Sequence, residues 1–191
     1  MDKTAAAPEK ASKAKRFGLL KRFRSDKRGS VAIEFAMLAM PFAMLVFAVL
    51  ETCISFAAQQ VMANATDDIA RNLRTGKLTP NMVTAASIRT LVCDNIRILV
   101  TVGCPELVID LKQYATYAAV PKTIPLLPNG DLNEAGFATT PGGPDTINSM
   151  RVFYRWPIMT DFMRAYLSSI PNGKTLLYTT MTWKNEGYPY P

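Results

Sequence analysis

The sequence predicts an α+β protein, in which a long N-terminal helix crosses a membrane and is followed by a small domain with an antiparallel sheet. A run of twenty residues with one charge occupies positions 31–50, helical periodicity continues beyond it, and three alternating segments follow later in the chain. The 191 residues can supply one modest globular domain in addition to an anchor. We therefore expect a basic leader at 1–29, a transmembrane helix at 30–52, a helical extension at 53–76 and a small α+β domain at 77–191.

The excess positive charge of the chain lies entirely in the leader. The first 29 residues hold ten Lys or Arg against three Asp or Glu, whereas the remainder has equal numbers of basic and acidic residues. Basic residues in front of a membrane span favour the cytoplasmic side. This pattern predicts a cytoplasmic N-terminus with the C-terminal domain outside, and it favours membrane orientation over the alternative of nucleic-acid binding.

The apolar run at positions 31–50 is suited to crossing a bilayer. Its twenty residues would rise about 30 Å as a helix, which matches the hydrocarbon core. Ten of them are Leu, Ile, Phe or Val, and together they favour insertion by about 3–6 kcal/mol, more than Glu34 costs one turn from the end. The alternatives are a buried core helix and a removable secretory signal, for which Ser55-Phe56-Ala57 is a small-x-small site.

Helical periodicity continues past the apolar run. Apolar residues recur every four positions from Val61 to Leu73, and neither Gly nor Pro occurs between Pro41 and Gly76. One helix over positions 30–75 is therefore predicted, with a kink at Pro41 and an end at Gly76.

The C-terminal region contains signals for one short helix and three strands. Thr79-Pro80 is typical of a helix start, with apolar residues from Met82 to Leu91 behind it. Alternating patterns predict strands at 107–112 and 151–156, and a segment rich in Thr and aromatic residues predicts a third at 176–183. Positions 121–144 hold nine Pro or Gly, which predicts an irregular loop.

Cys93 and Cys104 are the candidate disulfide. Ten residues lie between them, at a helix end and just before Pro105. Such a pair usually forms a bridge in an oxidising compartment, and so short a loop would contribute about 2–3 kcal/mol to stability. The alternative is two free buried thiols. The third cysteine, Cys53, is expected to be a small packing residue near the end of the span.

The sequence favours a non-enzymatic protein. It contains no histidine, which excludes His-based triads and most zinc sites, and it shows neither a nucleophile elbow nor a phosphate-binding loop. Asp67-Asp68 is better interpreted as a solvated helix face than as a metal site. Catalysis by a Ser/Lys pair or paired carboxylates is the alternative that sequence leaves open. We expect no cofactor and no small-molecule substrate.

The beginning of the apolar run resembles the class III signal of type IV pilins and pseudopilins. Gly29 precedes Ser30-Val31-Ala32-Ile33-Glu34-Phe35, between a basic leader and a hydrophobic helix. In that family a membrane aspartyl peptidase cuts after the glycine. The long leader, and Ser30 where classical pilins have Phe, are closer to the tight-adherence (Tad/Flp) branch. The chain is too long for a Flp major pilin and resembles TadE-like minor pseudopilins, with TadF as the neighbouring alternative. The segment RVFYRWP and the ending YTTMTWKNEGYP resemble the C-terminal part of TadE-like proteins more loosely.

The resemblance implies a protein of the bacterial inner membrane that takes part in Flp pilus assembly, with its C-terminal domain in the periplasm. Cleavage between Gly29 and Ser30 would need a prepilin peptidase as partner, and assembly would need the Flp-type major pilin and other Tad pseudopilins. Glu34, next to Phe35, would pair with the freed N-terminus of a neighbouring subunit. The alternative is that Glu34 reaches the lipid headgroups.

A small-residue face runs along the apolar helix. It could bring a second helix close, and its members, at spacings of four, three and four, are Ala32, Ala36, Ala39 and Ala43. The alternative to a pilus-assembly protein is an unprocessed, single-pass anchored periplasmic binding module.

Overall fold

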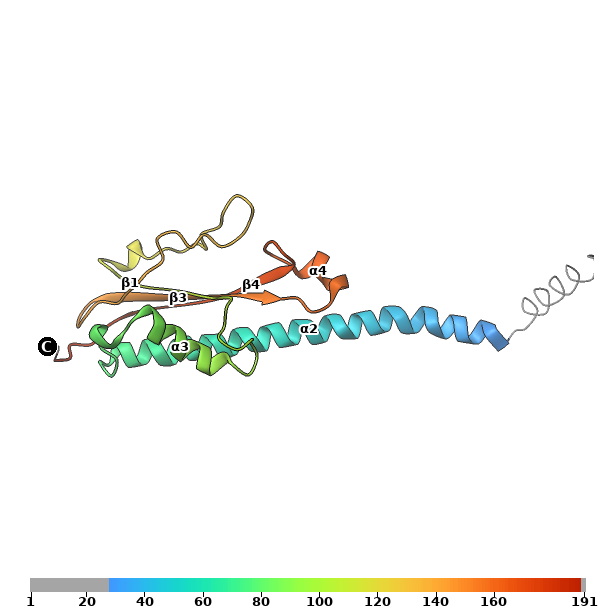
Figure 1. Ribbon diagram of the computed structural model, residues 1–191, viewed down its shortest axis with the longest axis horizontal. Helices are drawn as coiled ribbons and strands as arrows, with labels where there is room; N and C mark the ends of the chain where they lie inside the picture. The colour runs from blue at the N-terminus through green and yellow to red at the C-terminus, as the bar shows by residue number, and fades with distance from the viewer. Residues whose placement is uncertain (1–27, 190–191) are drawn as a thin grey trace, which may run out of the picture. The chain divides into compact units, whose positions relative to one another are not determined.

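The computed structural model describes residues 28–189 and has the α+β architecture that the sequence predicts (Figure 1). The chain divides into two compact units, Met1–Phe47 and Ala48–Pro191. The leader up to residue 27 lies outside the described residues. In chain order the described elements are α2 (Arg28–Arg74), a 3₁₀ helix (Pro80–Met82), α3 (Ala85–Ile96), β1 (Leu107–Tyr114), a 3₁₀ helix (Tyr117–Ala119), β2 (Thr139–Thr140), β3 (Ile147–Pro157), α4 (Asp161–Leu167) and β4 (Lys174–Lys184).

Helix α2 is continuous over 47 residues and runs through Pro41. In the first unit its side chains from residue 31 to residue 47 are exposed, with the half-buried Ala39 as the exception. Its most apolar window has a mean hydropathy of 2.2 and none of that window is buried, so α2 is a candidate membrane span. A core helix would have a buried face, so the exposure of this part of α2 counts against the alternative that positions 31–50 form a buried core helix.

The second half of α2 packs into the core of the second unit. Ala65, Ile69 and Leu73 are buried, as their four-residue spacing predicts, and Met62 lies beside them. Figure 1 shows this half of α2 and α3 on the same side of the sheet. One core joins them, with Ile88 and Val92 of α3 against buried side chains of the strands, including Leu107, Leu111, Met150, Val152, Tyr154 and Trp156.

The sheet is mixed, and the prediction of an antiparallel sheet was wrong in this respect. Among the described residues its strand order is β2-β1-β3-β4, and the β1–β3 and β3–β4 pairs are antiparallel. The short strand β2 pairs in parallel with β1, with Leu111 opposite Thr139. Parallel neighbours need a crossover connection, and the long loop between β1 and β2 provides it. Periodicity could not reveal β2, because two residues are too few to show a pattern.

The short helix begins later than Thr79-Pro80 predicts. Pro80 starts only a 3₁₀ helix, and Thr79 makes no side-chain cap. Helix α3 is instead capped at Thr84, whose hydroxyl accepts a hydrogen bond from Ser87 N while the Ser87 side chain accepts one from Thr84 N. This reciprocal capping box satisfies two backbone donors at once and therefore fixes the helix start.

Candidate functional site

The predicted processing residues lie in the first two turns of α2. Gly29, Ser30, Glu34 and Phe35 are all exposed. The Ser30 hydroxyl donates a hydrogen bond of 3.0 Å to Glu34 Oε1. The chain itself therefore satisfies part of the hydrogen-bonding capacity of this carboxylate, which remains open to a cation from outside.

Gly29 has no structural reason to be glycine in this fold. It is the second residue of α2, and a Cβ added there would meet no described atom within 4 Å. Packing within the described residues therefore does not require glycine at this position.

The four alanines of the apolar helix share one face. Successive residues of an α-helix are about 100° apart, so spacings of four, three and four bring side chains back to the same side. Ala32, Ala36 and Ala43 are exposed and Ala39 is half-buried. A helix that packed on this face could approach the backbone of α2 closely.

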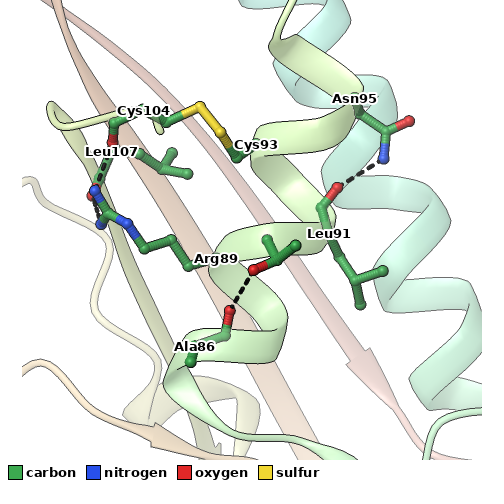
Figure 2. Close-up of a disulfide and its surroundings, with 8 residues drawn as sticks. Ala86, Arg89, Leu91, Cys93, Asn95, Cys104 and Leu107 are labelled. Carbon is green, nitrogen blue, oxygen red and sulfur yellow. Dashed lines mark hydrogen bonds between the residues drawn. A yellow bond between two sulfur atoms is a disulfide. The ribbon is translucent and has the colours of Figure 1, made fainter. Parts of the chain in front are cut away.

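Cys93 at the end of α3 and Cys104 before β1 are joined by a disulfide, with a Cα–Cα distance of 5.9 Å (Figure 2). Arg89, one turn before Cys93, reaches the same loop from α3: its guanidinium donates hydrogen bonds to the carbonyl oxygens of Cys104 and Leu107. The bridge and this arginine together fix both ends of residues 94–103. Sequence analysis singled out the cysteines and missed Arg89, because its carbonyl partners carry no signal in the sequence.

A buried ion pair holds the long loop against the sheet. Asp110 is 1% exposed, and its Oδ2 accepts a hydrogen bond of 2.6 Å from Arg151 of β3. Its Oδ1 accepts a hydrogen bond from Ala138 N, at the point where the loop returns beside β1. The Arg151 guanidinium lies 5.3 Å from the centre of the Phe137 ring. The alternating pattern assigned Asp110 to a polar face, but the loop covers that face, so the carboxylate is buried and paired.

Arg155 of β3 forms two further ion pairs with the loop, and these are more exposed. Arg155 donates hydrogen bonds to Asp131 (3.0 Å) and Glu134 (2.8 Å). The hydrogen bond from Arg155 lowers the pKa of Asp131 below its ordinary value of 3.8. Burial alone would lower the pKa of Arg155, but its bonds to Glu134 and Asp131 raise it above its ordinary value. Both partners are thus held in their charged forms.

The described residues hold no cluster typical of a metal site, and a hollow beside α2 and α3 lacks buried polar groups. Within residues 28–189, no group of three or more His, Cys, Asp or Glu is placed to hold a metal ion, and Asp67 and Asp68 are exposed. A hollow of about 650 Å³ lies beside α2 and α3. None of its polar lining residues is buried, so it lacks the converging polar groups that fix a small ligand; they are Asp68, Arg71, Asn72, Lys77 and Asn95.

The comparisons with known proteins concern α2. The family model described as TadE-like protein matches residues 29–71. No curated protein and no solved structure gives a match. The matched segment starts at Gly29 and ends inside the last turn of α2. The resemblance to TadE-like proteins that the sequence predicts is thereby confirmed over residues 29–71.

Proposed function

We propose that the protein is a minor pseudopilin that is anchored in the bacterial inner membrane and takes part in the assembly of Flp-type pili. The observation that carries the proposal is the TadE-like match, which begins at Gly29 and includes Glu34 in an exposed apolar helix. A pilus component of this kind needs a membrane helix and a subunit contact, and it needs no catalytic site.

The proposed topology follows from charge. The leader at 1–29 stays in the cytoplasm, residues 30–52 cross the membrane, and residues 53–76 with the domain at 77–191 lie in the periplasm. The Cys93–Cys104 disulfide supports this orientation, because such bridges persist in the oxidising periplasm and are rare in the cytoplasm.

Processing by a prepilin peptidase would create the second charge that assembly needs. Cleavage after Gly29 frees the α-amino group of Ser30, a cation at neutral pH. We propose that it pairs with Glu34 of a neighbouring subunit. An unpaired carboxylate at the membrane edge is costly, and a partner's ammonium group relieves that cost, so the assembled arrangement becomes preferable to the lone subunit. The Ser30–Glu34 hydrogen bond within the chain is neutral on the serine side and leaves the charge uncompensated.

The test of processing is the mass of the protein extracted from membranes that contain the peptidase. The parent should lose 29 residues, and Gly29→Val should keep them, because the branched side chain replaces the residue at the cleavage site. Gly18→Val in the leader is the matched control and should be processed like the parent. A mature parent that still begins with Met1 contradicts the pseudopilin function and favours the unprocessed binding module.

The test of the assembly role is the substitution of Glu34. Glu34→Gln and Glu34→Leu should insert and be cleaved, yet fail to support pili in electron micrographs of cells, because the neighbouring α-amino group loses its partner. Asp67→Asn, which removes an exposed carboxylate from the other half of α2, is the control and should leave piliation unchanged. If Glu34→Leu is processed and pili form as in the parent, the glutamate only reaches the headgroups.

A further inference from the structure

The most exposed apolar side chains of the second unit come from two segments. Among its described residues, four large apolar side chains are more than 70% exposed: Ile98 at 89%, Val102 at 95%, Met159 at 72% and Tyr166 at 76%. Phe162 of α4 packs against Tyr166 with the two rings tilted by 51° and their centroids 5.8 Å apart. Single exposed apolar residues are ordinary on a protein surface. Here, however, the most exposed apolar side chains of the unit come from only two segments, which indicates a surface that contacts a partner.

Strand register brings these two segments to one end of the sheet. Leu107, the first residue of β1, pairs with Tyr154 near the end of β3. Pro157, the last residue of β3, pairs with Lys174, the first residue of β4. The connections at 97–106 and 158–173 therefore leave the sheet at the same end (Figure 1).

Helix α2 enters the second unit at this same end. Glu51 accepts hydrogen bonds from Met159 N (2.6 Å), from Thr160 N (3.2 Å) and from the Thr160 hydroxyl (2.7 Å). At the other end of the sheet, Glu186 N donates to the carbonyl of Arg74. Leu50, the last residue of the apolar run, directly precedes Glu51, so the proposed span at 30–52 ends within one residue of the point where Met159 and Thr160 are bonded to the helix.

The exposed residues of the first segment are held outward by a fixed loop. The disulfide and Arg89 pin residues 94–103 at the base, as Figure 2 shows. Leu99 and Val100 of the same loop pack partly buried against the core, whereas Ile98 and Val102 point away from it. The loop therefore has a defined structure, in which some apolar residues face the core and Ile98 and Val102 face outward.

We propose that Ile98, Val102, Met159, Phe162 and Tyr166 form an interfacial face that inserts into the outer headgroup region of the lipid bilayer. The proposal rests on the proposed membrane span, because that span brings the bilayer surface to Glu51 in every copy of the chain. Tyrosine suits this depth, since its apolar ring and polar hydroxyl match the boundary between lipid tails and water, and phenylalanine adds an apolar ring beside it. Insertion would fix the domain against the membrane at the point where α2 leaves it.

The charges beside the interfacial face predict the lipid preference. Of the charged residues in the two segments, Glu106 pairs with Lys174 at 2.8 Å and Asp161 pairs with Arg164 at 2.9 Å, which leaves Arg97, beside Ile98, as the one described cation of these segments without an ion pair. An uncharged apolar insertion depends little on anionic lipid or salt, unlike a polybasic surface. The face should therefore contact zwitterionic and anionic bilayers alike.

The test measures contact with lipid in vesicles that hold the full chain and no other protein. Cys53 is replaced by serine, and one new cysteine carries an environment-sensitive nitrobenzoxadiazole label. Labels at Val102→Cys and Tyr166→Cys should be quenched severalfold more by phosphatidylcholine with a nitroxide near the headgroup than labels at Met82→Cys and Tyr117→Cys. These two controls are also exposed, at 64% and 55%, and lie beyond the ends of α2 and β1 at the other end of the sheet.

A label at Leu45→Cys, quenched by nitroxide deep in the lipid tails, tests the span independently. If the label at position 45 is quenched while the labels at positions 102 and 166 behave like the two control labels, the interfacial face is refuted and the membrane anchor stands. If Leu45 is not quenched, the span itself fails. Quenching at Val102 and Tyr166 that appears only with phosphatidylglycerol, or that disappears at 0.5 M salt, overturns apolar insertion.

Discussion

Gly76, which ends α2, is subject to two constraints at the scale of a single residue. Its φ of +74° lies in the left-handed region that side chains disfavour. In addition, a Cβ at this position would lie 2.6 Å from Cγ of Tyr188, in the C-terminal segment. The sequence predicted the helix end at Gly76 from the first constraint, whereas the second arises from residues more than a hundred positions away.

We predict that Gly76→Ala lowers the free energy of unfolding by about 2–4 kcal/mol, from backbone strain and overpacking together. Gly103→Ala is the matched control, because Gly103 has a φ of +80° and open space around it. Gly103→Ala should lower the free energy of unfolding by the backbone strain alone, about 1–2 kcal/mol. Urea unfolding monitored by circular dichroism measures both values, and equal losses in the two variants would show that contact with Tyr188 contributes nothing.

The Asp131 carboxylate gives the long loop a dependence on pH. Because Arg155 lowers the pKa of Asp131 in the folded state, the ion pair stabilises the fold above the ordinary pKa of 3.8. That contribution is lost as pH falls through the lowered pKa. The difference in unfolding free energy between the parent and Asp131→Asn should therefore be constant above about pH 5 and shrink in more acidic solution. When both proteins also carry Arg155→Gln, the difference in unfolding free energy between them should lose most of its pH dependence. If the pH dependence is unchanged, it arises from a group other than the Asp131–Arg155 pair.

At the scale of elements, the disulfide fixes the loop between α3 and β1. On the chain-entropy account, a bridge that spans so few residues contributes about 2–3 kcal/mol by restricting the unfolded chain. We predict that Cys93→Ser combined with Cys104→Ser lowers the free energy of unfolding by this amount. Cys53→Ser, which removes the exposed free cysteine, should change it by less than about 0.5 kcal/mol. Guanidinium unfolding without reductant gives both values, and a similar loss in the two proteins would contradict the prediction.

The elements that the sequence predicted are those whose signal is long. Helix α2 has an apolar run and a four-residue repeat, and the strand signals at 107–112, 151–156 and 176–183 lie within β1, β3 and β4. The elements that it missed depend on distant parts of the chain. Helix α4 has seven residues and is held by Glu51, more than a hundred positions away, and β2 exists only because the loop returns beside β1. Local pattern carries no information on such contacts.

The same distinction applies to the candidate site. Gly29, Glu34 and the alanine face could be named from spacing, because they lie on one helix. The interfacial face could not, because only strand register places the segments of Val102 and Tyr166 at the same end of the sheet. Arg89 and the buried Asp110–Arg151 pair were also missed, since carbonyl partners and burial under a loop leave no local pattern.

At the scale of the whole molecule, the chain combines a helix that matches the TadE-like family model over residues 29–71 with a domain that packs on the second half of that helix. The end of α2 is joined to the C-terminal segment by the Glu186–Arg74 backbone hydrogen bond and ion pair. The small-residue face, in contrast, lies in the part of α2 whose side chains are exposed. Self-association or pilin binding through that face should therefore respond to substitutions that leave the folded domain unaffected.

We predict that Ala36→Leu combined with Ala39→Leu weakens crosslinking to Flp-type pilins or to a second copy of the chain severalfold, because larger side chains keep a neighbouring helix from close approach. Ala48→Leu is the matched control, since at about 100° per residue it lies nearly opposite Ala32 on the helix. The urea unfolding midpoint of the domain should be the same in all three proteins, which separates lost association from lost folding. Crosslinking in membranes at several protein concentrations measures the effect. Equal crosslinking in the double variant and the Ala48→Leu control would remove the small-residue face from the assembly mechanism, and leave Glu34 as the one proposed contact between subunits.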